Sequence, residues 1–313
     1  MKKKIVFMMT VILFISACGS DKQTASEDDA HVLAMEAFTF ERNFSTDYEV
    51  SEIQRGALSI STFSGLCSNG EEIFLSDART KVVNKYDSKF NLVDSFSSEH
   101  FISPTLLAYD EGLLFVLDES LEEVFSLDDK SGEVLKRVSL PEKDPDSDYL
   151  DLCVEGEKLY LTYRTALFSD AHIVVVDLDD ESSYFIGEDF FGTLTSDGSK
   201  VFAANSLVSY GDPGQSGFRT GENHVYEISG KELVKSFACI QGCIPSDFIM
   251  SGRSFYVYAA GWSSIDLYSW DGSYQTSLVQ FEDSDLDSQM VKHEETIFLL
   301  MRDNNKLYQV KRK

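Results

Sequence analysis

The sequence predicts an all-β fold, a six-bladed β-propeller with four-stranded blades. Three observations predict it: an apolar–aromatic–apolar triplet that occurs six times, a nearly regular spacing between the copies, and turn glycines just ahead of most of them. The triplets are Ile73-Phe74-Leu75, Leu114-Phe115-Val116, Leu159-Tyr160-Leu161, Val201-Phe202-Ala203, Phe255-Tyr256-Val257 and Ile297-Phe298-Leu299. Successive aromatic residues are 41, 45, 42, 54 and 42 positions apart. A period in this range with about four short strands per unit is typical of propeller blades.

The first two strands of each unit flank a tight turn. A large apolar residue lies seven positions before each triplet, at Leu66, Leu107, Leu152, Leu194, Phe248 and Met290. A glycine follows it in five units, at Gly70, Gly112, Gly156, Gly198 and Gly252. Pairs such as Asn69-Gly70 and Asp197-Gly198 between apolar runs favour hairpin turns, because these residues tolerate positive φ. Each unit therefore begins with a strand, a turn and a strand.

A third and a fourth strand follow each triplet. The expected third strands are 82–86, 121–127, 172–178, 223–228, 264–270 and 306–310, and the expected fourth strands are 91–96, 133–140, 183–186, 232–238 and 274–281. The sixth unit lacks a fourth strand of its own. Because an unpaired edge invites aggregation, we expect an N-terminal strand within residues 48–63 to pair with the last blade and close the ring. A seven-bladed ring or another all-β fold with periodic strands is the alternative.

Residues 1–18 have the pattern of a secretory signal. Lysines at positions 2–4 precede an apolar run, Ile5 to Ile15, that is too short to span a membrane. The ending Ile15-Ser16-Ala17-Cys18 resembles the lipobox of bacterial lipoproteins, which implies that Cys18 is acylated and becomes the first mature residue. Several acyl chains give stable anchoring. We therefore expect a bacterial cell-envelope protein, lipid-anchored to the outer membrane, periplasmic or surface-exposed; an ordinary signal peptide with a coincidental cysteine is the alternative.

The remaining chain divides into two parts. Residues 19–44 are polar and acidic and have no strand pattern, which predicts a flexible tether. Residues 45–313 contain all six units and predict the propeller domain. The expected order is therefore signal peptide, tether and propeller.

The other four cysteines are interpreted by their positions. Cys67 and Cys153 occupy the same column in two different units, so we expect buried thiols that are too far apart for a disulfide. Cys239 and Cys243 flank a three-residue loop segment, where a local disulfide and two free thiols are both open. A two-ligand metal site there is the weaker alternative, because no histidine lies near in the sequence.

The chain is strongly acidic, with 53 acidic and 27 basic residues and a net charge of −26. This balance argues against a nucleic-acid partner, which would require a basic stripe. It also argues against direct adsorption on anionic lipid. A soluble, self-repelling exterior is its simplest interpretation.

Two acidic loops imitate the ligand spacing of a helix-loop-helix calcium site. Asp144, Asp146 and Asp148 alternate, with Glu155 eleven residues after the first, and Asp283, Asp285, Asp287 and Glu294 repeat the pattern. A predicted strand of about five residues, roughly 16 Å long, separates each glutamate from its aspartates. We therefore predict no metal site, and a loose carboxylate-only site is the alternative.

One face of the ring carries the candidate binding residues. Connections from second to third and from fourth to first strands emerge on this face, and two of them, 162–171 and 204–222, are long neighbours. The candidate ligand-binding residues are Arg79, Tyr163, Arg164, Arg219, Trp262 and Arg302. Guanidinium groups bind carboxylates and sulfates bidentately, so these residues predict a pocket for a carboxylated, sulfated or sugar-like ligand. The alternative is that the arginines pair with acidic neighbours.

The sequence contains no nucleophile elbow, glycine-rich phosphate loop or zinc signature. Its five histidines are scattered over the tail, loops and strand starts. We therefore predict no catalytic residue and no cofactor, and we lean against an enzyme.

The lipobox at Cys18, the acidic tether and the six repeated units resemble the six-bladed β-propeller lipoproteins of the Bacteroidota, related to NHL-type propellers. The resemblance covers about residues 45–313 and implies the fold but no catalytic motif. We expect a membrane-anchored envelope lipoprotein that acts as a binding module for a glycan, a peptide or a partner protein. A hydrolase or lyase that uses loop carboxylates, with or without a divalent metal, is the second hypothesis, and a structural subunit of an envelope complex is the third.

Overall fold

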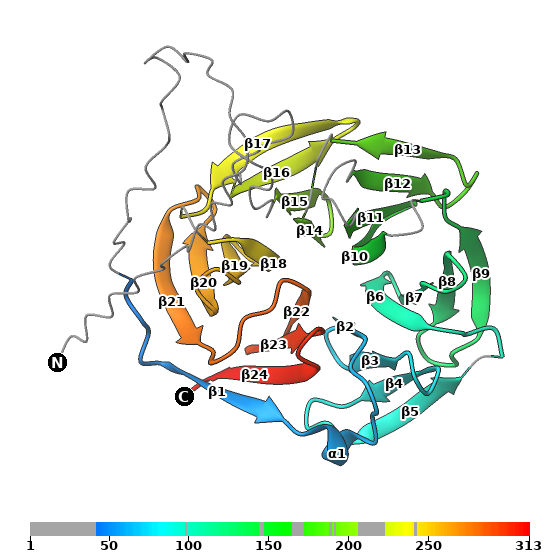
Figure 1. Ribbon diagram of the computed structural model, residues 1–313, viewed down its shortest axis with the longest axis horizontal. Helices are drawn as coiled ribbons and strands as arrows, with labels where there is room; N and C mark the ends of the chain where they lie inside the picture. The colour runs from blue at the N-terminus through cyan, green and yellow to red at the C-terminus, as the bar shows by residue number, and fades with distance from the viewer. Residues whose placement is uncertain are drawn as a thin grey trace, which may run out of the picture.

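Six four-stranded antiparallel sheets stand around a central axis (Figure 1). The computed structural model describes residues 42–97, 99–143, 147–164, 172–187, 190, 192–205, 223–240 and 243–313. In five sheets the four strands follow chain order from the centre outward, whereas the sixth has the order β22, β23, β24 and then β1; each innermost strand contacts the innermost strands of the neighbouring blades. The predicted six-bladed β-propeller is confirmed.

The strands of the first three blades follow the repeat. Blade I contains β2 (Gly65–Ser68), β3 (Ile73–Asp77), β4 (Val82–Tyr86) and β5 (Leu92–Ser97). Blade II contains β6 (Pro104–Asp110), β7 (Leu113–Asp118), β8 (Glu123–Asp128) and β9 (Val134–Ser139). Blade III contains β10 (Asp148–Glu155), β11 (Lys158–Arg164), β12 (Ile173–Asp177) and β13 (Ser183–Ile186).

Blades IV and V repeat the same order, and blade VI differs in its outermost strand. Blade IV contains β14 (Gly192–Ser196), β15 (Val201–Asn205), β16 (His224–Ser229) and β17 (Glu232–Ala238). Blade V contains β18 (Pro245–Ser251), β19 (Ser254–Ala259), β20 (Ser264–Ser269) and β21 (Tyr274–Gln280). Blade VI contains β22 (Ser288–His293), β23 (Thr296–Met301), β24 (Lys306–Arg312) and, from the other end of the chain, β1 (Tyr48–Ile53).

Strand β1 closes the ring as predicted. It pairs antiparallel with β24 in an unbroken register from Tyr48 opposite Arg312 to Ile53 opposite Leu307. The outer strand of blade VI therefore comes from the start of the domain and its other three strands from the end. A single helical turn, α1 (Arg55–Leu58), connects β1 to blade I.

The residues just before β1 attach to blade V. The backbone of Ser277 in β21 donates to the Asn43 carbonyl and accepts from Ser45, both at 2.8 Å, which forms an isolated parallel bridge. The Arg42 guanidinium donates to Ser264 Oγ at 2.6 Å and lies 3.8 Å from the buried carboxylate of Asp266. The last residues of the predicted tether are thus packed against the propeller.

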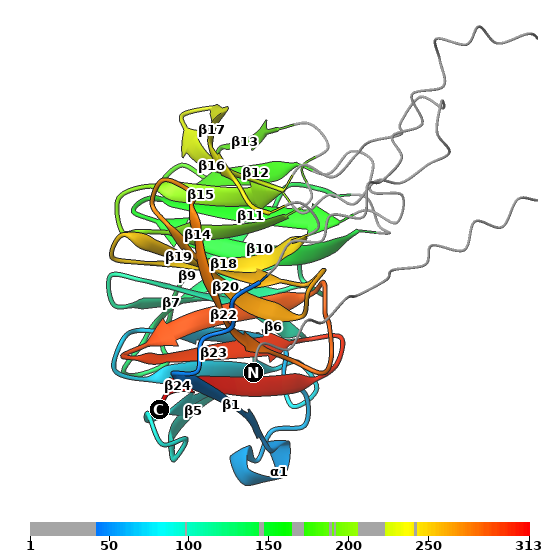
Figure 2. The same cartoon turned by 90° about the vertical axis from the view of Figure 1, so that its left-hand side faces the viewer.

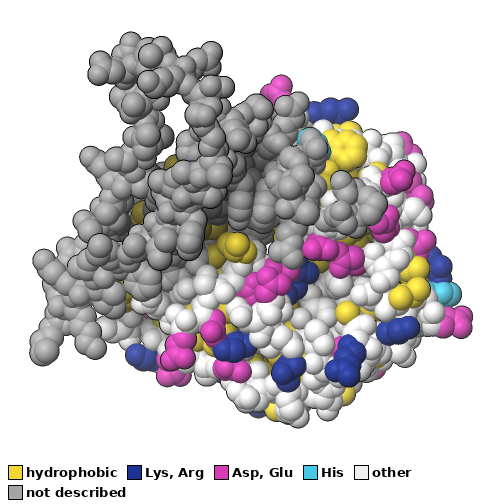
Figure 3. Space-filling model, in the orientation of Figure 1, with side chains coloured by type: hydrophobic (Ala, Val, Ile, Leu, Met, Phe, Trp, Pro, Cys, Tyr) yellow, Lys and Arg dark blue, Asp and Glu magenta, His cyan; other side chains and the backbone are white. Residues whose placement is uncertain are grey.

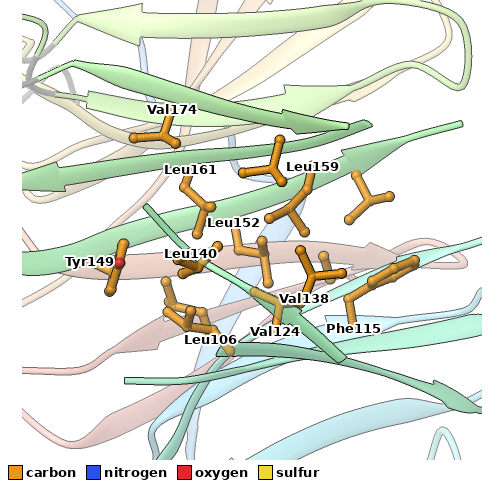
Figure 4. Packing of buried hydrophobic residues seen from close by; sticks show 14 of the residues in the cluster. Leu106, Phe115, Val124, Val138, Leu140, Tyr149, Leu152, Leu159, Leu161 and Val174 are labelled. Atoms are coloured by element: carbon orange, nitrogen blue, oxygen red, sulfur yellow. The ribbon is translucent and has the colours of Figure 1, made fainter. Parts of the chain in front are cut away.

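The repeated triplets form the core between blades. Their first residues are all buried, as are five of the six aromatic residues, whereas Tyr256 is half-buried. Figure 4 shows one interface, in which Leu106 and Val124 of blade II lie against Leu152 and Leu161 of blade III. Cys67 and Cys153 are buried free thiols in two different clusters, as expected.

The face seen in Figure 1 carries the predicted connections. Backbone hydrogen bonds join second-to-third turns to fourth-to-first turns there, such as Glu119 to the Ser103 carbonyl (3.1 Å) and Arg302 to the Asp287 carbonyl (2.8 Å). The hairpin turns lie on the opposite side, on the left of Figure 2. We refer to the side seen in Figure 1, and in the same orientation in Figure 3, as the loop face.

Candidate functional site

The four predicted binding residues whose side chains the structure describes come from four different blades. Arg79 is an exposed residue in the turn after β3, Tyr163 is buried in blade III, and Trp262 packs against the core of blade V. Arg302 follows β23 and points over the central channel. The side chain of Arg164 and all of Arg219 lie outside the described residues. The structure therefore does not bring Arg79, Trp262 and Arg302 into one pocket.

Arg79 is positioned by an aspartate at the end of β3. Asp77 Oδ1 accepts the backbone N–H groups of Arg79 (3.0 Å) and Thr80 (3.1 Å), and its Oδ2 accepts that of Ser61 (2.6 Å). Asp118 has the same role in blade II, where Oδ2 accepts from Ile102 and Ser103. These buried carboxylates shape the loops, and the Arg79 side chain is exposed.

Arg302 bridges opposite sides of the ring. Its Nε donates to Asp287 Oδ1 at 2.7 Å, and its Nη2 also contacts that carboxylate. The same Nη2 donates to the Leu150 carbonyl of blade III at 3.0 Å. Since blades VI and III face each other, the guanidinium spans the mouth of the channel. The pairing of this arginine with an acidic neighbour agrees with the alternative interpretation given above.

Two buried carboxyls line the channel below Arg302. The hydroxyl of Thr193 lies 2.6 Å from Asp151 Oδ2 and 2.9 Å from Asp247 Oδ1. Asp151 Oδ2 also accepts the backbone N–H of Leu194 in the next blade at 2.7 Å, and Asp247 accepts that of Met290. Each aspartate therefore connects its own innermost strand to the following one.

The Thr193 hydroxyl has one proton and cannot donate to both carboxyls. The second contact is satisfied when one carboxyl is protonated and donates to the hydroxyl oxygen. Burial raises the pKa of Asp247 well above its ordinary value, and the neighbouring Asp151 raises it further. Burial also raises the pKa of Asp151, but the positive charge of Arg302 opposes that shift. We therefore assign the proton to Asp247 and the negative charge to Asp151.

Sequence reasoning missed this pair, although a signal exists one position before the apolar column. That column reads Gly65, Leu106, Asp151, Thr193, Asp247 and Gln289. Gln289 acts like the aspartates, since its Oε1 accepts the backbone N–H of Leu66 at 2.8 Å. Position 65 requires glycine, because a Cβ there would lie 2.2 Å from the Thr105 carbonyl oxygen. Polar residues between apolar neighbours in an innermost strand indicate this channel lining.

A cavity opens beside blade III. It has a volume of about 450 Å³ and lies between that blade and the connection from blade II, residues 140–143. Tyr149, Tyr163 and Phe185 contribute aromatic rings to its wall, and Leu161 and Val174 lie between them. Pockets of a few hundred cubic ångströms with apolar walls are typical of small-ligand sites. Of the predicted residues whose side chains the structure describes, Tyr163 is the one that lines this cavity.

Polar groups lie at one end of the cavity. Lys143 has its ammonium 5.2 Å from the centre of the Tyr149 ring and 3.6 Å from Glu122. Glu142 and His172 complete the polar lining. Nδ1 of His172 is in contact with the Gly187 carbonyl, which can only accept, so Nδ1 carries a proton. In a neutral ring Nε2 is then an acceptor.

The two cysteines between blades IV and V are buried free thiols. Burial raises the pKa of Cys243 well above its ordinary value, and the adjacent Cys239 thiol adds to that effect. The thiols are thus neighbours, and the structure describes them in the free-thiol form, which is one of the two states left open by the sequence.

The acidic loops contain no metal-binding cluster among the described residues. Asp283 pairs with Lys306, Asp287 with Arg302, and Asp285 accepts the backbone N–H of Asn304 at 3.0 Å. Asp148 and Glu155 mark the two ends of β10, as the strand argument requires. Residues 144–146 lie outside the described part of the chain. Across that part, no helix has the length and apolar character needed to cross a membrane.

No protein-family model and no curated protein matches this chain. Among solved structures it is similar to virginiamycin B lyase from Staphylococcus aureus, with 11% identity, a TM-score of 0.53, and coverage of 84% of this chain and 99% of that one. It is also similar to a streptogramin B lyase (14%, TM-score 0.52, 85% and 98%) and a luciferin-regenerating enzyme (11%, TM-score 0.55, 84% and 95%). At these identities the likeness shows the fold alone. The class is a six-bladed β-propeller, which is compatible with an enzyme or a binding module.

Proposed function

We propose that this chain is a membrane-anchored lipoprotein of the cell envelope whose loop face binds a glycan, a peptide or a partner protein. The observation that carries the binding role is the aromatic-lined cavity of about 450 Å³ beside blade III. The lipobox ending at Cys18 and the acidic segment after it support the anchor. The resemblance to Bacteroidota propeller lipoproteins and to NHL-type propellers belongs to the same proposal.

A second candidate function is a hydrolase or lyase. The carboxyl pair Asp151 and Asp247 favours it, because carboxyls that share a proton occur in catalytic sites, and two of the similar structures are lyases. Asp151 and Asp247 accept backbone N–H groups and contact the Thr193 hydroxyl. Their oxygens are therefore engaged in holding strands together, and binding is the better supported role.

The anchor is tested by changing Cys18 to alanine. We expect the wild-type protein to sediment with membranes and to require detergent for release, and the Cys18→Ala variant to be recovered in the soluble fraction. The physical reason is that the acyl chains supply the membrane affinity. A matched Cys67→Ala variant controls for loss of a thiol. Continued membrane association of the Cys18→Ala protein would remove the anchor from the proposal.

The binding role is tested by thermal denaturation with panels of oligosaccharides and peptides, each with calcium and with chelator. We expect one ligand class to raise the melting temperature, because a ligand that binds only the folded state stabilises it. Tyr163→Ala should reduce that shift and Arg79→Ala, distant from the cavity, should not. Turnover of a panel member, or a requirement for calcium, would favour the enzyme instead.

A further inference from the structure

We infer that the cavity beside blade III binds a compact, ring-containing apolar molecule that has a hydrogen-bond donor and no net negative charge. The inference rests on the binding role proposed for this cavity, and it names a ligand class different from the glycan, peptide or partner protein considered above. Three features of the described residues carry it: the apolar wall, the surplus of carboxylates around the only lysine in the lining, and the orientation of His172.

The wall is one continuous apolar surface. Side chains on one face of blade III form it through cross-strand neighbours, with Tyr149 opposite Tyr163 on β10 and β11, and Leu161 opposite Val174 on β11 and β12. Phe185 continues the row on β13, opposite Val174. Phe185 is nevertheless 52% exposed. A flat apolar ligand would cover this ring and the tyrosine faces together, and offset contacts between rings favour a ligand with a ring.

The charge around the cavity disfavours an anion. Among the described residues, Lys143 is the one cation in the lining, and it already contacts the Tyr149 ring, the Glu122 carboxylate and the Ser147 carbonyl. Glu142 lines the cavity, and Glu119 lies beside it with its Oε1 3.2 Å from the Tyr149 amide. A bound carboxylate or sulfonate would therefore meet the Glu142 carboxylate and a lysine that is already paired with Glu122, and like charges repel.

His172 indicates a donor on the ligand. Its Nδ1 proton is used by the Gly187 carbonyl, and its ring also lies 5.7 Å from the Phe185 ring. With the proton on Nδ1, Nε2 is the ring nitrogen that can accept a hydrogen bond, and His172 belongs to the lining of the cavity. A ligand N–H or O–H next to an aromatic body would satisfy this nitrogen while the rings stack.

Two fluorescent probes with the same ring body test this inference. N-Phenyl-1-naphthylamine is neutral and carries an N–H, and 8-anilinonaphthalene-1-sulfonate adds a sulfonate to that body. The protein is the full chain with Cys18→Ala, so that no lipid takes up the probes. We expect the neutral probe to bind about ten-fold more tightly than the sulfonate. The Glu142→Gln substitution removes a negative charge from the lining, so it should reduce the difference in affinity between the two probes.

Variants place the probe in the cavity. Phe185→Ser should weaken the neutral probe about five-fold, because it removes an exposed ring from the wall without disturbing the core. Leu135→Ser is the matched control, since Leu135 is equally exposed on the outer strand of blade II, outside the lining. Binding of the neutral probe that is unchanged by Phe185→Ser would overturn the inference, as would equal or tighter binding of the sulfonate.

The outcome is separable from that of the proposed function. If neither probe binds but an oligosaccharide or a peptide raises the melting temperature of the same protein, the apolar ligand class is wrong and the binding role stands. If no probe and no panel member binds, both fail.

Discussion

A chain that lacks residues 48–53 is expected to lose cooperative folding and to aggregate. These residues form β1, which pairs with β24 over six positions and packs Tyr48 and Ile53 against the clusters on either side of blade VI. Six paired residues at about 1 kcal/mol per hydrogen bond, plus the apolar contacts, give a loss on the order of 5 kcal/mol. This is comparable with the whole stability of a typical domain.

The measurement is urea denaturation followed by circular dichroism, with size-exclusion chromatography to detect aggregates. A chain that begins at Arg42 is the control, because it keeps β1 and the contacts with blade V. We expect the control to unfold like the full protein. A monomeric deletion variant with an unchanged midpoint would show that ring closure does not require β1.

Replacing Asp247 by alanine is expected to lower the free energy of unfolding by about 2–4 kcal/mol. The change removes the acceptor of the Met290 and Phe248 backbone N–H groups and the contact with Thr193, all inside the channel. A buried donor without an acceptor is costly because it has lost water as well. Asp94→Ala is the matched control on an exposed strand and should change stability by less than about 0.5 kcal/mol.

The Asp247→Asn substitution keeps the shape of the side chain but removes its ability to ionise, so it tests the effect of the charge on stability. The pKa of Asp247 is raised in the folded state, so below the unfolded value both states hold the proton and no penalty arises. As the pH rises, the unfolded chain releases its proton first, and the native protein loses stability until its own carboxyl ionises. The stability of the Asp247→Asn variant should therefore rise relative to that of the wild type as the pH increases above about 4. Equal pH profiles of the two proteins in urea titrations would contradict the protonated assignment.

The fold was predictable because each blade repeats the same physical requirements. The aromatic triplet fills the space between blades, and the glycine turns need positive φ, as Gly70 and Gly198 show at 89° and 84°. Several expected strands, including 82–86 and 232–238, agree with the structure residue by residue. Strand β1 was predicted from the unpaired edge of blade VI, which requires a partner strand.

The site was less predictable because it depends on contacts between blades. The position of Arg302 on a loop identified it as a candidate. Its hydrogen bond to the Leu150 carbonyl could not be predicted, because that residue lies on the opposite side of the channel. Tyr163 was found for its place on a long connection, whereas Phe185 and His172 complete the cavity only because β12 and β13 lie beside it. Such neighbours are far apart in the sequence and share no spacing rule.

The attachment of Arg42 and Ser45 to blade V determines how the N-terminal end of this domain can come loose. The chain is held by Ser264, Asp266 and Ser277 before it reaches the ring closure. Fraying or pulling from that end must first break the contacts with blade V. Only then can it separate β1 from β24 in blade VI. Residues 42–45 thus protect the pairing of β1 with β24 against fraying that starts at the N-terminal end.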